Sequence, residues 1–357
     1  MDAHHVVHVL SSLKVGGAER FVIDLSELQR QQEMSVSIAS FGNPADPLVE
    51  VCGQHQLPVT HITGSLWGKY RRLYHLTRNN PILHVHSPAA LRAMMPFLLT
   101  LGRHLRLVYT RHGAAPLAGK RWQRVHNLLR HRLHQITFVS EDGRNQFLST
   151  YPWESRQCQV IENGIALPEI STPPQPQNPI RLGMVGRLVP IKHQIGLLQA
   201  LETLSERRQQ FTLDVFGDGP CRQELESFCQ THLSDMEVHF HGNVSDRHRI
   251  YDAMDVLVVT SQSEGLSIAM LEAMARQIPC IATAVGGNPR LVEDGHTGSL
   301  VDYDNPTQLA SRLSGIQENP EQLVRWGIHA REWVARYFSI ERTAACYQQI
   351  YQQGISR

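Results

Sequence analysis

Short apolar runs alternate with amphipathic stretches along this 357-residue chain, and the alternation constrains its fold more than any other feature. Runs of four to six apolar residues suit strands that are buried on both faces of a sheet. The stretches between them have helical spacing, as at 19–31, 194–208, 220–231 and 266–276. The pattern predicts an α/β chain of βα units around parallel sheets. The expected strands are 6–10, 36–40, 59–62, 83–86, 105–110, 136–140, 159–162, 181–185, 212–216, 238–241, 256–260, 280–283 and 298–301.

A proline-rich segment divides the chain into two halves. Residues 167–180 contain five prolines and no apolar periodicity, which is typical of an interdomain linker. The total length suits two α/β domains of roughly 150–200 residues each. We therefore expect a first domain at 1–167, a linker at 168–180, a second domain at 181–335 and a helical tail at 336–357.

The cysteines and the chain start indicate a compartment. Six cysteines are scattered without a C-x-x-C pair, and the start lacks a basic region followed by an apolar one. The longest apolar segment, 94–101, is too short to span a bilayer and contains Pro96. These features predict a reduced, cytoplasmic protein with buried thiols.

The segment 263–275 places two carboxylates, Glu264 and Glu272, where an apolar strand gives way to a helix. A carboxylate accepts hydrogen bonds in pairs and so suits a vicinal diol of a sugar. Between them, Gly265, Leu266 and Ser267 form a turn whose backbone N–H groups, at a helix N-terminus, favour a phosphate. Together these features indicate a nucleotide-sugar site. The alternative is that Glu264 caps the helix and that Glu272 is a solvated helical residue.

A second motif upstream favours the nucleotide-sugar hypothesis. Gly186, Arg187 and Lys192 follow the apolar run 182–185 in an expected strand-to-helix turn. Two cations in such a turn can reach one diphosphate and can stabilise the charge that builds up as it leaves. The alternative is that both are surface cations that solvate the start of a helix.

Three more turns follow expected strands in the second half: Phe-Gly-Asp-Gly-Pro at 216–220, His-Gly-Asn-Val at 241–244, and Ala-Val-Gly-Gly-Asn-Pro at 284–289. In motif order and spacing, residues 180–302 resemble the retaining glycosyltransferases of family four, which have the GT-B fold. The first half resembles them less. The resemblance implies two Rossmann-like parallel-sheet domains that face a central cleft, with a C-terminal helix that crosses back to the first domain.

The resemblance also implies roles for individual residues of the second half. Glu264 would hold hydroxyls of the transferred sugar, and Glu272 would hold the ribose. Backbone groups near Asn243 and Val244 would receive the base, whose identity the motif does not specify.

Two features of the first half resemble the same family. Gly16 and Gly17 follow the first expected strand, and glycines there let the backbone approach a ligand closely at a helix N-terminus. They resemble the family's Gly-Gly-x-Glu loop, which faces the donor diphosphate and the acceptor; the alternative is an ordinary turn. His112 follows the fifth expected strand, where the family often has a histidine near the donor sugar and the reacting centre.

Charge is unevenly distributed, although the net charge is only +1. Residues 51–140 contain no Asp or Glu but 13 Lys or Arg and 10 His. Such a surface attracts lipid headgroups, lipid diphosphates or anionic glycans. Within it, 119–133 is expected to form a basic helix with Trp122 beside its cations, which suits a membrane surface; a solvated face over buried leucines is the alternative. No base-reading motif indicates nucleic acid.

We therefore expect a retaining glycosyltransferase that moves a hexose or N-acetylhexosamine from a nucleotide-diphosphate sugar, with UDP-sugars favoured, to a cell-envelope glycan or lipid-linked acceptor. Arg187, Lys192, Glu264 and His112 are its candidate catalytic residues. The alternatives are a GDP-mannose-dependent mannosyltransferase, an epimerase or phosphorylase on the same architecture, and a silent partner subunit that only binds nucleotide-sugar or lipid. We expect a cytoplasmic protein that contacts the inner face of the membrane peripherally.

We expect no cofactor and no metal. Asp302 and Asp304 form a D-x-D pair, a device that holds a metal and its diphosphate in the other large glycosyltransferase fold. Here Pro306 follows closely, and turn formation explains the pair. Arg187 and Lys192 can supply the electrostatic stabilisation that a metal would give.

Overall fold

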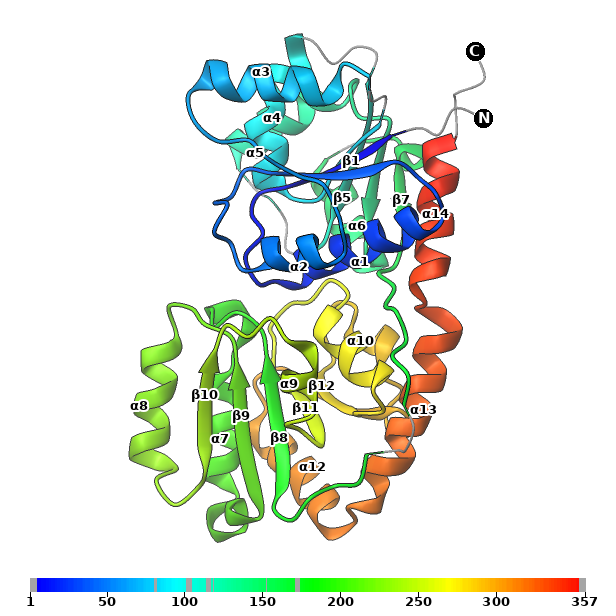
Figure 1. Cartoon of the computed structure of the whole chain (residues 1–357). Helices are drawn as coiled ribbons and strands as arrows, with labels where there is room; N and C mark the ends of the chain where they lie inside the picture. The colour runs from blue at the N-terminus through cyan, green and yellow to red at the C-terminus, as the bar shows by residue number, and fades with distance from the viewer. Residues whose placement is uncertain are drawn as a thin grey trace. The chain divides into compact units, whose positions relative to one another are not determined.

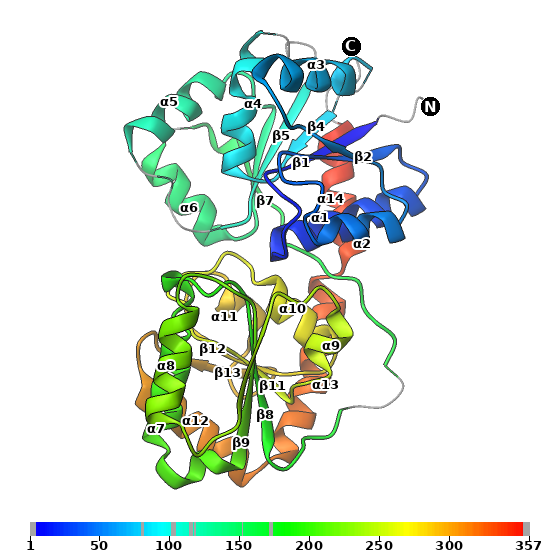
Figure 2. The same cartoon turned by 60° about the vertical axis from the view of Figure 1, so that its left-hand side comes forward.

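The computed structural model describes residues 5–79, 82–100, 105–113, 117, 119–151, 153–170 and 174–352. The chain divides into two compact units: the first comprises Met1–Gly164 and Ile340–Arg357, and the second comprises Ile165–Ser339 (Figures 1 and 2). Each unit is a parallel sheet with helices on both faces. All the expected strands are present, each within two residues of its expected bounds. The α/β prediction is therefore confirmed.

The sheet of the first unit has seven strands in the order β3-β2-β1-β4-β5-β6-β7. Its order reverses between β1 and β4, because the chain adds strands first on one side of β1 and then on the other. The strands are β1 (Val6–Leu10), β2 (Val36–Ser40), β3 (Val59–His61), β4 (Ile82–Val85), β5 (Arg106–Arg111), β6 (Gln135–Phe138) and β7 (Cys158–Val160). The helices are α1 (Gly17–Gln31), α2 (Leu48–Gln54), α3 (Leu66–Thr77), α4 (Pro88–Thr100), α5 (Lys120–Leu129), α6 (Glu141–Thr150) and α14 (Ile340–Gln352).

The sheet of the second unit has six strands in the order β10-β9-β8-β11-β12-β13, and its order reverses between β8 and β11. The strands are β8 (Ile180–Val185), β9 (Phe211–Phe216), β10 (Val238–Gly242), β11 (Val256–Val259), β12 (Cys280–Thr283) and β13 (Gly298–Val301). The helices are α7 (Ile195–Thr203), α8 (Arg222–His232), α9 (Arg247–Tyr251), α10 (Ile268–Ala275), α11 (Asn288–Leu291), α12 (Pro306–Glu318) and α13 (Glu321–Tyr337). Figure 2 shows α7, α8 and α12 on one face of this sheet and α9, α10 and α13 on the other.

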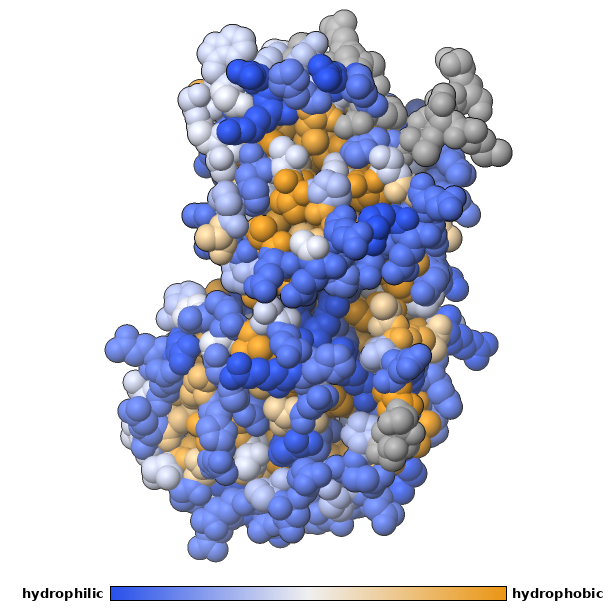
Figure 3. Space-filling view, in the orientation of Figure 1, coloured by the Kyte–Doolittle hydropathy of each residue, from blue (hydrophilic) through white to orange (hydrophobic). Residues whose placement is uncertain are grey.

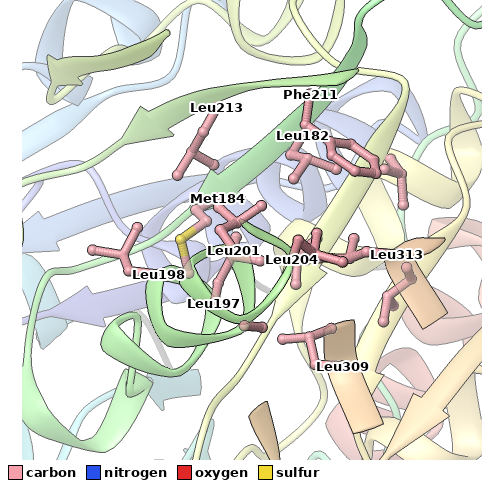
Figure 4. Packing of buried hydrophobic residues seen from close by; sticks show 14 of the residues in the cluster. Leu182, Met184, Leu197, Leu198, Leu201, Leu204, Phe211, Leu213, Leu309 and Leu313 are labelled. Carbon is pink, nitrogen blue, oxygen red and sulfur yellow. The ribbon is translucent and has the colours of Figure 1, made fainter. Parts of the chain in front are cut away.

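Leucines from strands and helices form the core of the second unit (Figure 4). Leu182 and Leu213 of the sheet meet Leu197 of α7 and Leu313 of α12, and all four side chains are completely buried. Truncating one such leucine to alanine typically costs about 2–5 kcal/mol. This packing fixes β8 and the start of α7, between which the motif with Arg187 and Lys192 lies.

Two expected helices are interrupted. The helix expected at 194–208 ends at Thr203, because Ser205 takes a left-handed conformation with φ 52° and a 3-10 turn follows. The helical tail expected from residue 336 begins inside α13, and a new helix, α14, starts at Ile340 after a break at Phe338 and Ser339. There the Phe338 carbonyl accepts a hydrogen bond of 2.8 Å from the Ile165 N–H, and Ser339 forms a β-bridge with Ile165. This pairing replaces helical hydrogen bonds and ends α13.

The C-terminal helix α14 belongs to the first unit, as the resemblance predicts, and packs beside α1. Two of its tyrosines reach buried polar groups of the sheet. The Tyr351 hydroxyl lies 2.6 Å from His84 Nδ1, and the Tyr347 hydroxyl lies 3.1 Å from Thr110 Oγ1. Burial raises the pKa of Tyr347 to about 12, so this hydroxyl keeps its proton at neutral pH. The last helix therefore completes the core of the first unit.

The cysteines are free thiols. Burial raises the pKa of Cys52, Cys158 and Cys229 to about 11, so these thiols are protonated and unreactive at neutral pH. Among the described residues, no helix combines the length and the hydrophobicity that a membrane span requires.

Candidate active site

A small pocket of about 20 Å³ lies in the second unit at the carboxyl ends of β8 and β11. The strand order reverses between these two strands, and doubly wound sheets bind ligands at such a switch point. The pocket contains three residues that the sequence singled out: Lys192, Glu264 and Ser267. The other lining residues are Met184, Val185, Gln194, Val258, Val259, Thr260 and Ser261.

Lys192 and Glu264 form an ion pair inside this pocket. Lys192 Nζ donates to Glu264 Oε1 over 2.5 Å, and Ser261 Oγ donates to the same oxygen over 2.6 Å. The Glu264 side chain is 9% exposed, so the pair is shielded from solvent. The second oxygen, Oε2, has no partner among the described residues. Sequence reasoning assigned the two residues to different parts of a ligand and missed their pairing, because 72 positions separate them.

Two loops hold this pair in place. Lys192 ends a 3-10 turn at Pro190–Lys192 that follows β8. Thr260 Oγ1 donates to the His193 carbonyl over 2.7 Å, and the Gln262 N–H donates to the Ile191 carbonyl over 2.9 Å. The loop after β11 is thus hydrogen-bonded to the loop after β8, which fixes the Lys192 backbone relative to Glu264.

The Gly286–Gly287 turn supports Glu264 from the other side. A Cβ at Gly287 would overlap the carbonyl oxygen of Gly265, and Gly286 has a positive φ of 53°. The turn after β12 therefore packs backbone against backbone on the Glu264–Gly265 turn, and only glycine allows this approach. The sequence singled out the motif at 284–289 but gave it no role; its role here is support.

Arg187 lies at the exposed surface beside the pocket and is not part of its lining. Its side chain forms no ion pair with any described residue, while its carbonyl accepts a hydrogen bond of 2.8 Å from Gln194 Nε2. The preceding Gly186 has a φ of 149°, and a Cβ at Gly217 would overlap its carbonyl oxygen. Arg187 is therefore a cation on a tightly packed loop, without a counter-ion in the part of the chain that the structure describes.

Glu272 is buried, at 2% exposure, which excludes the alternative of a solvated helical residue. Arg247 Nε donates to its Oε1 over 2.6 Å, and the Tyr251 hydroxyl donates to its Oε2 over 2.5 Å. Both donors lie on α9, directly after the loop that contains the exposed Asn243 and the half-buried Val244. The carboxylate therefore fixes the position of α9, and sequence reasoning missed Arg247 and Tyr251 because neither belongs to a motif.

Glu264 does not cap α10, so the alternative interpretation of Glu264 as a helix cap is excluded as well. Ser267 is the N-cap, and its hydroxyl accepts from the Met270 N–H over 3.4 Å. Gly265 and Leu266 are buried in the turn before it. The Ser267 hydroxyl is thus used by the helix itself.

The site residues of the first unit meet at the carboxyl ends of β1 and β5. Gly16 is the N-cap of α1 and has an extended backbone, and Gly17 is its first residue. One turn further on, the Phe21 ring contacts the edge of the His112 ring, with 5.5 Å between centroids. Desolvation lowers the pKa of His112 to about 4, so the ring is neutral at neutral pH. Its Nδ1 is buried and has no hydrogen-bond partner among the described residues.

Two groups of side chains among the described residues have donor atoms close enough to hold a metal ion: His8 with His84 and His86, and Asp214 with His239 and His241. Neither includes the D-x-D pair. Asp304 has a left-handed φ of 55° and lies 3.5 Å from His193 Nε2, and Asn305 caps α12. The pair thus forms the turn that leads into α12.

Two family descriptions match most of the chain. "Glycosyltransferase Family 4" matches residues 15–168, and "Glycosyl transferases group 1" matches residues 169–333. The putative glycosyltransferase EpsD of Bacillus subtilis is 30% identical over 160 residues, which are 45% of this chain and 42% of that protein. The GDP-mannose-dependent alpha-(1-6)-phosphatidylinositol monomannoside mannosyltransferase of Mycolicibacterium smegmatis is 28% identical over 56% of each chain. The chain therefore spans about half the length of these curated relatives.

Solved structures extend the likeness to the whole chain. Anabaena Alr3699/HepE, crystallised with UDP and glucose, is 20% identical, has a TM-score of 0.83, and is matched over 98% of this chain and 99% of its own. At this identity the likeness establishes the fold. With the two family matches, it shows that this chain has the GT-B fold and belongs to the group 1 glycosyltransferases of family four.

Proposed function

We propose that the protein transfers a hexose or N-acetylhexosamine from a nucleotide-diphosphate sugar to a cell-envelope glycan or lipid-linked acceptor, with retention of configuration at the anomeric carbon. The observation that carries the proposal is the pocket at the switch point of the second unit. It combines a shielded Lys192–Glu264 pair with Ser267 at a helix N-terminus, and the exposed cation Arg187, which forms no ion pair with a described residue, lies on the adjoining loop.

In this proposal the cations bind the diphosphate, and the carboxylates bind hydroxyl groups of the sugar and the ribose. Lys192 and Arg187 would stabilise the negative charge that develops on the leaving diphosphate, which lets the reaction proceed without a metal. Glu264 Oε2 would accept hydrogen bonds from sugar hydroxyls, while its Oε1 stays on Lys192 and Ser261. Glu272, together with Arg247, would hold the ribose end, close to the loop at Asn243 and Val244 that would receive the base.

Retention follows from attack on the face that the diphosphate leaves. The acceptor hydroxyl oxygen bonds to the anomeric carbon, the bond from that carbon to the diphosphate oxygen breaks with its electron pair, and the departing diphosphate takes the acceptor proton. Glu264 is the single carboxylate that lines the pocket among the described residues, and it is paired with Lys192. That pairing favours a binding role for Glu264 over a role as a covalent nucleophile.

The donor is proposed as a UDP-sugar. HepE was crystallised with UDP and glucose, whereas the mycobacterial relative is named as GDP-mannose-dependent, so GDP-mannose is the second candidate. The melting temperature should therefore be measured with UDP, GDP and ADP on the wild type, on Arg187→Ala and on Arg207→Ala. Arg207 is an exposed arginine in the 3-10 turn at Ser205–Gln210, outside the pocket, and serves as the matched control.

One nucleotide should raise the melting temperature of the wild type and of Arg207→Ala, but not that of Arg187→Ala. That nucleotide identifies the donor class. If no nucleotide raises it, or if Arg187→Ala responds like the wild type, the proposed diphosphate site is wrong. Turnover of the matching donor with a cell-envelope extract then separates an enzyme from a silent partner that binds the same ligand.

The acceptor is proposed to be membrane-bound, and α3 is the surface that supports this. Leu66 and Trp67 at its start are 86% and 78% exposed, and Lys69, Arg71 and Arg72 follow within the next turn and a half. Figure 3 shows strongly hydrophilic side chains gathered over α3 beside apolar area of the same unit. Exposed Leu and Trp next to cations suit insertion into an anionic bilayer, and the acid-free sequence at 51–140 removes repulsion.

Co-sedimentation with vesicles tests this contact. The wild type should sediment with vesicles of phosphatidylcholine and phosphatidylglycerol, and much less with phosphatidylcholine alone or at high salt. The double variant Leu66→Ser, Trp67→Ser should lose most of this binding, whereas Tyr303→Ser, which changes an exposed aromatic of the second unit, should keep it. Equal sedimentation of both variants would show that α3 is not the contact.

A further inference from the structure

A continuous chain of hydrogen bonds runs through the buried centre of the first unit and ends at His112. Gln29 Oε1 lies 2.8 Å from His8 Nε2, and His8 Nδ1 lies 2.9 Å from His86 Nε2. His86 Nδ1 in turn lies 3.2 Å from His112 Nε2. Gln29, His8 and His86 are at most 2% exposed, so water does not interrupt the chain. The four residues come from four different elements: Gln29 from α1, His8 from β1, His86 from the end of β4 and His112 from the end of β5.

The protonation state of these rings gives the chain a direction. Desolvation lowers the pKa of His8 to about 4 and lowers that of His86 well below its ordinary value, so both rings are neutral at neutral pH. A neutral imidazole has one N–H and one lone pair, and it therefore donates at one nitrogen and accepts at the other. Because His8 and His86 each use both nitrogens in the chain, they must donate in the same direction, and His86 then sets whether His112 Nε2 donates or accepts. One end of the chain consequently determines the tautomer at the other.

Gln29 provides the end of the chain: its carbonyl oxygen faces His8 Nε2, and its amide nitrogen is buried without a hydrogen-bond partner among the described residues. Its carbonyl oxygen can only accept, so His8 Nε2 carries a hydrogen and donates to it. His8 Nδ1 then accepts from His86 Nε2–H, and His86 Nδ1 accepts from His112 Nε2–H. This leaves the lone pair of His112 on Nδ1, which is buried and has no partner among the described residues.

We propose that Gln29, His8 and His86 are positioning residues that hold His112 as the Nε2–H tautomer and so make its Nδ1 an obligate hydrogen-bond acceptor. An acceptor of this kind recognises a hydroxyl of the bound sugar and rejects the oxygens of a phosphate, which carry no hydrogen. The assignment to a sugar hydroxyl rests on the proposed function; the assignment of the tautomer does not.

The nearby His84 does not belong to the chain. Its ring lies against His86, with 3.9 Å between centroids, but its nitrogens are used by Thr110 Oγ1 at 2.7 Å and by the Tyr351 hydroxyl at 2.6 Å. The six ring nitrogens of His8, His84 and His86 thus each have a hydrogen-bond partner. This favours a hydrogen-bonded network over a metal site at the same residues, and it supplies a control.

Long-range proton–nitrogen NMR of protein labelled with ¹⁵N-histidine tests the tautomer directly, with His112 assigned by its missing signal in His112→Ala. At pH 7.5 the wild type should show His112 as the Nε2–H tautomer. Gln29→Met removes the fixed acceptor and should convert His112 to a mixture of tautomers. Tyr347→Phe removes a buried hydroxyl that lies 3.1 Å from Thr110 Oγ1, the partner of His84 Nε2, outside the chain, and should leave the His112 signals unchanged.

Binding measurements test the role of the tautomer in sugar recognition separately from the tautomer assignment itself. Gln29→Met should weaken binding of the nucleotide-sugar donor by about five- to tenfold, as expected for the loss of one hydrogen bond. The donor tested is UDP-glucose, or the sugar conjugate of whichever nucleotide the melting test identifies. Binding of the free nucleotide should be unchanged. A wild-type Nδ1–H tautomer, or tight Zn²⁺ binding that shifts the His8 and His86 signals, would overturn the inference even if the enzyme is active. If the wild type binds no nucleotide at all, the proposed function fails while the tautomer result stands.

Discussion

His126 is predicted to make the first unit sensitive to acid. Its side chain is completely buried on α5, and neither ring nitrogen has a hydrogen-bond partner among the described residues. It is surrounded by the aromatic rings of Phe147, Tyr151 and Trp153, with centroids 5.2, 4.4 and 6.1 Å away. Desolvation, together with the nearby charge of Arg111, lowers its pKa from the ordinary 6.5 to about 4.

The sign and size of the effect follow from linkage. Above pH 6.5 the ring is neutral in the folded and the unfolded chain, so the shift has no effect on stability. As the pH falls from 6.5 towards 4, the unfolded chain takes up a proton that the folded chain cannot, and stability is lost. A pH of 5 lies about 1.5 units below the unfolded pKa of 6.5 and still above the folded pKa. At about 1.4 kcal/mol per unit, the unfolding free energy is lower at pH 5 by about 2 kcal/mol.

Urea unfolding at pH 7.5 and pH 5, followed by tryptophan fluorescence, measures this loss in the wild type and in His126→Leu. Leucine has a similar volume and no titratable group. The other buried histidines remain in both proteins, so their contributions cancel in the comparison. The wild type should lose about 2 kcal/mol more than the variant between the two pH values. Equal losses, or a larger loss in the variant, would refute the reasoning.

Three further predictions concern the second unit. Glu264→Gln should reduce donor turnover about 10²–10³-fold, measured as sugar release from the donor, because Lys192 loses its counter-charge and the sugar loses an acceptor. Gly287→Ala should lower the unfolding free energy by about 1–3 kcal/mol, because its Cβ overlaps the Gly265 carbonyl. The matched change Gly315→Ala, in open space on α12, should be neutral or raise the unfolding free energy by up to about 1 kcal/mol in the same urea experiment. Tyr251→Phe removes the hydroxyl that donates to Glu272 and should cost about 1 kcal/mol by thermal unfolding, while leaving nucleotide affinity within twofold.

The strands could be predicted because parallel strands are covered on both faces, so most of them appear as short runs in which apolar residues predominate. β1 and β2, for example, are buried at every position. The break between α13 and α14 could not be predicted, because it depends on pairing of Ser339 with Ile165, 174 positions earlier in the sequence. The apolar periodicity of the sequence continues across the break, and no local sequence signal indicates the β-bridge that competes with the helix.

The site was predictable where a turn motif marks it and not where distant side chains meet. Lys192 and Glu264 were each identified from their own turns, but their pairing became visible only in three dimensions. His112 was identified by resemblance, whereas His8 and His86 looked like ordinary members of apolar strands. The signal that could have found them is a histidine in a run that is otherwise apolar, because a buried imidazole needs partners for both nitrogens.

The place of α14 has a consequence for how the protein is made. The Tyr351 hydroxyl bonds to His84, 267 positions earlier in the chain, and Tyr347 bonds to Thr110. A ribosome that has released residues 1–339 has therefore delivered every strand of the first unit without the helix that closes its core. During that interval the apolar and polar groups that α14 covers are open to chaperones and to aggregation. The second unit, Ile165–Ser339, has no such delay, so it can complete its fold before the unit that precedes it in the sequence.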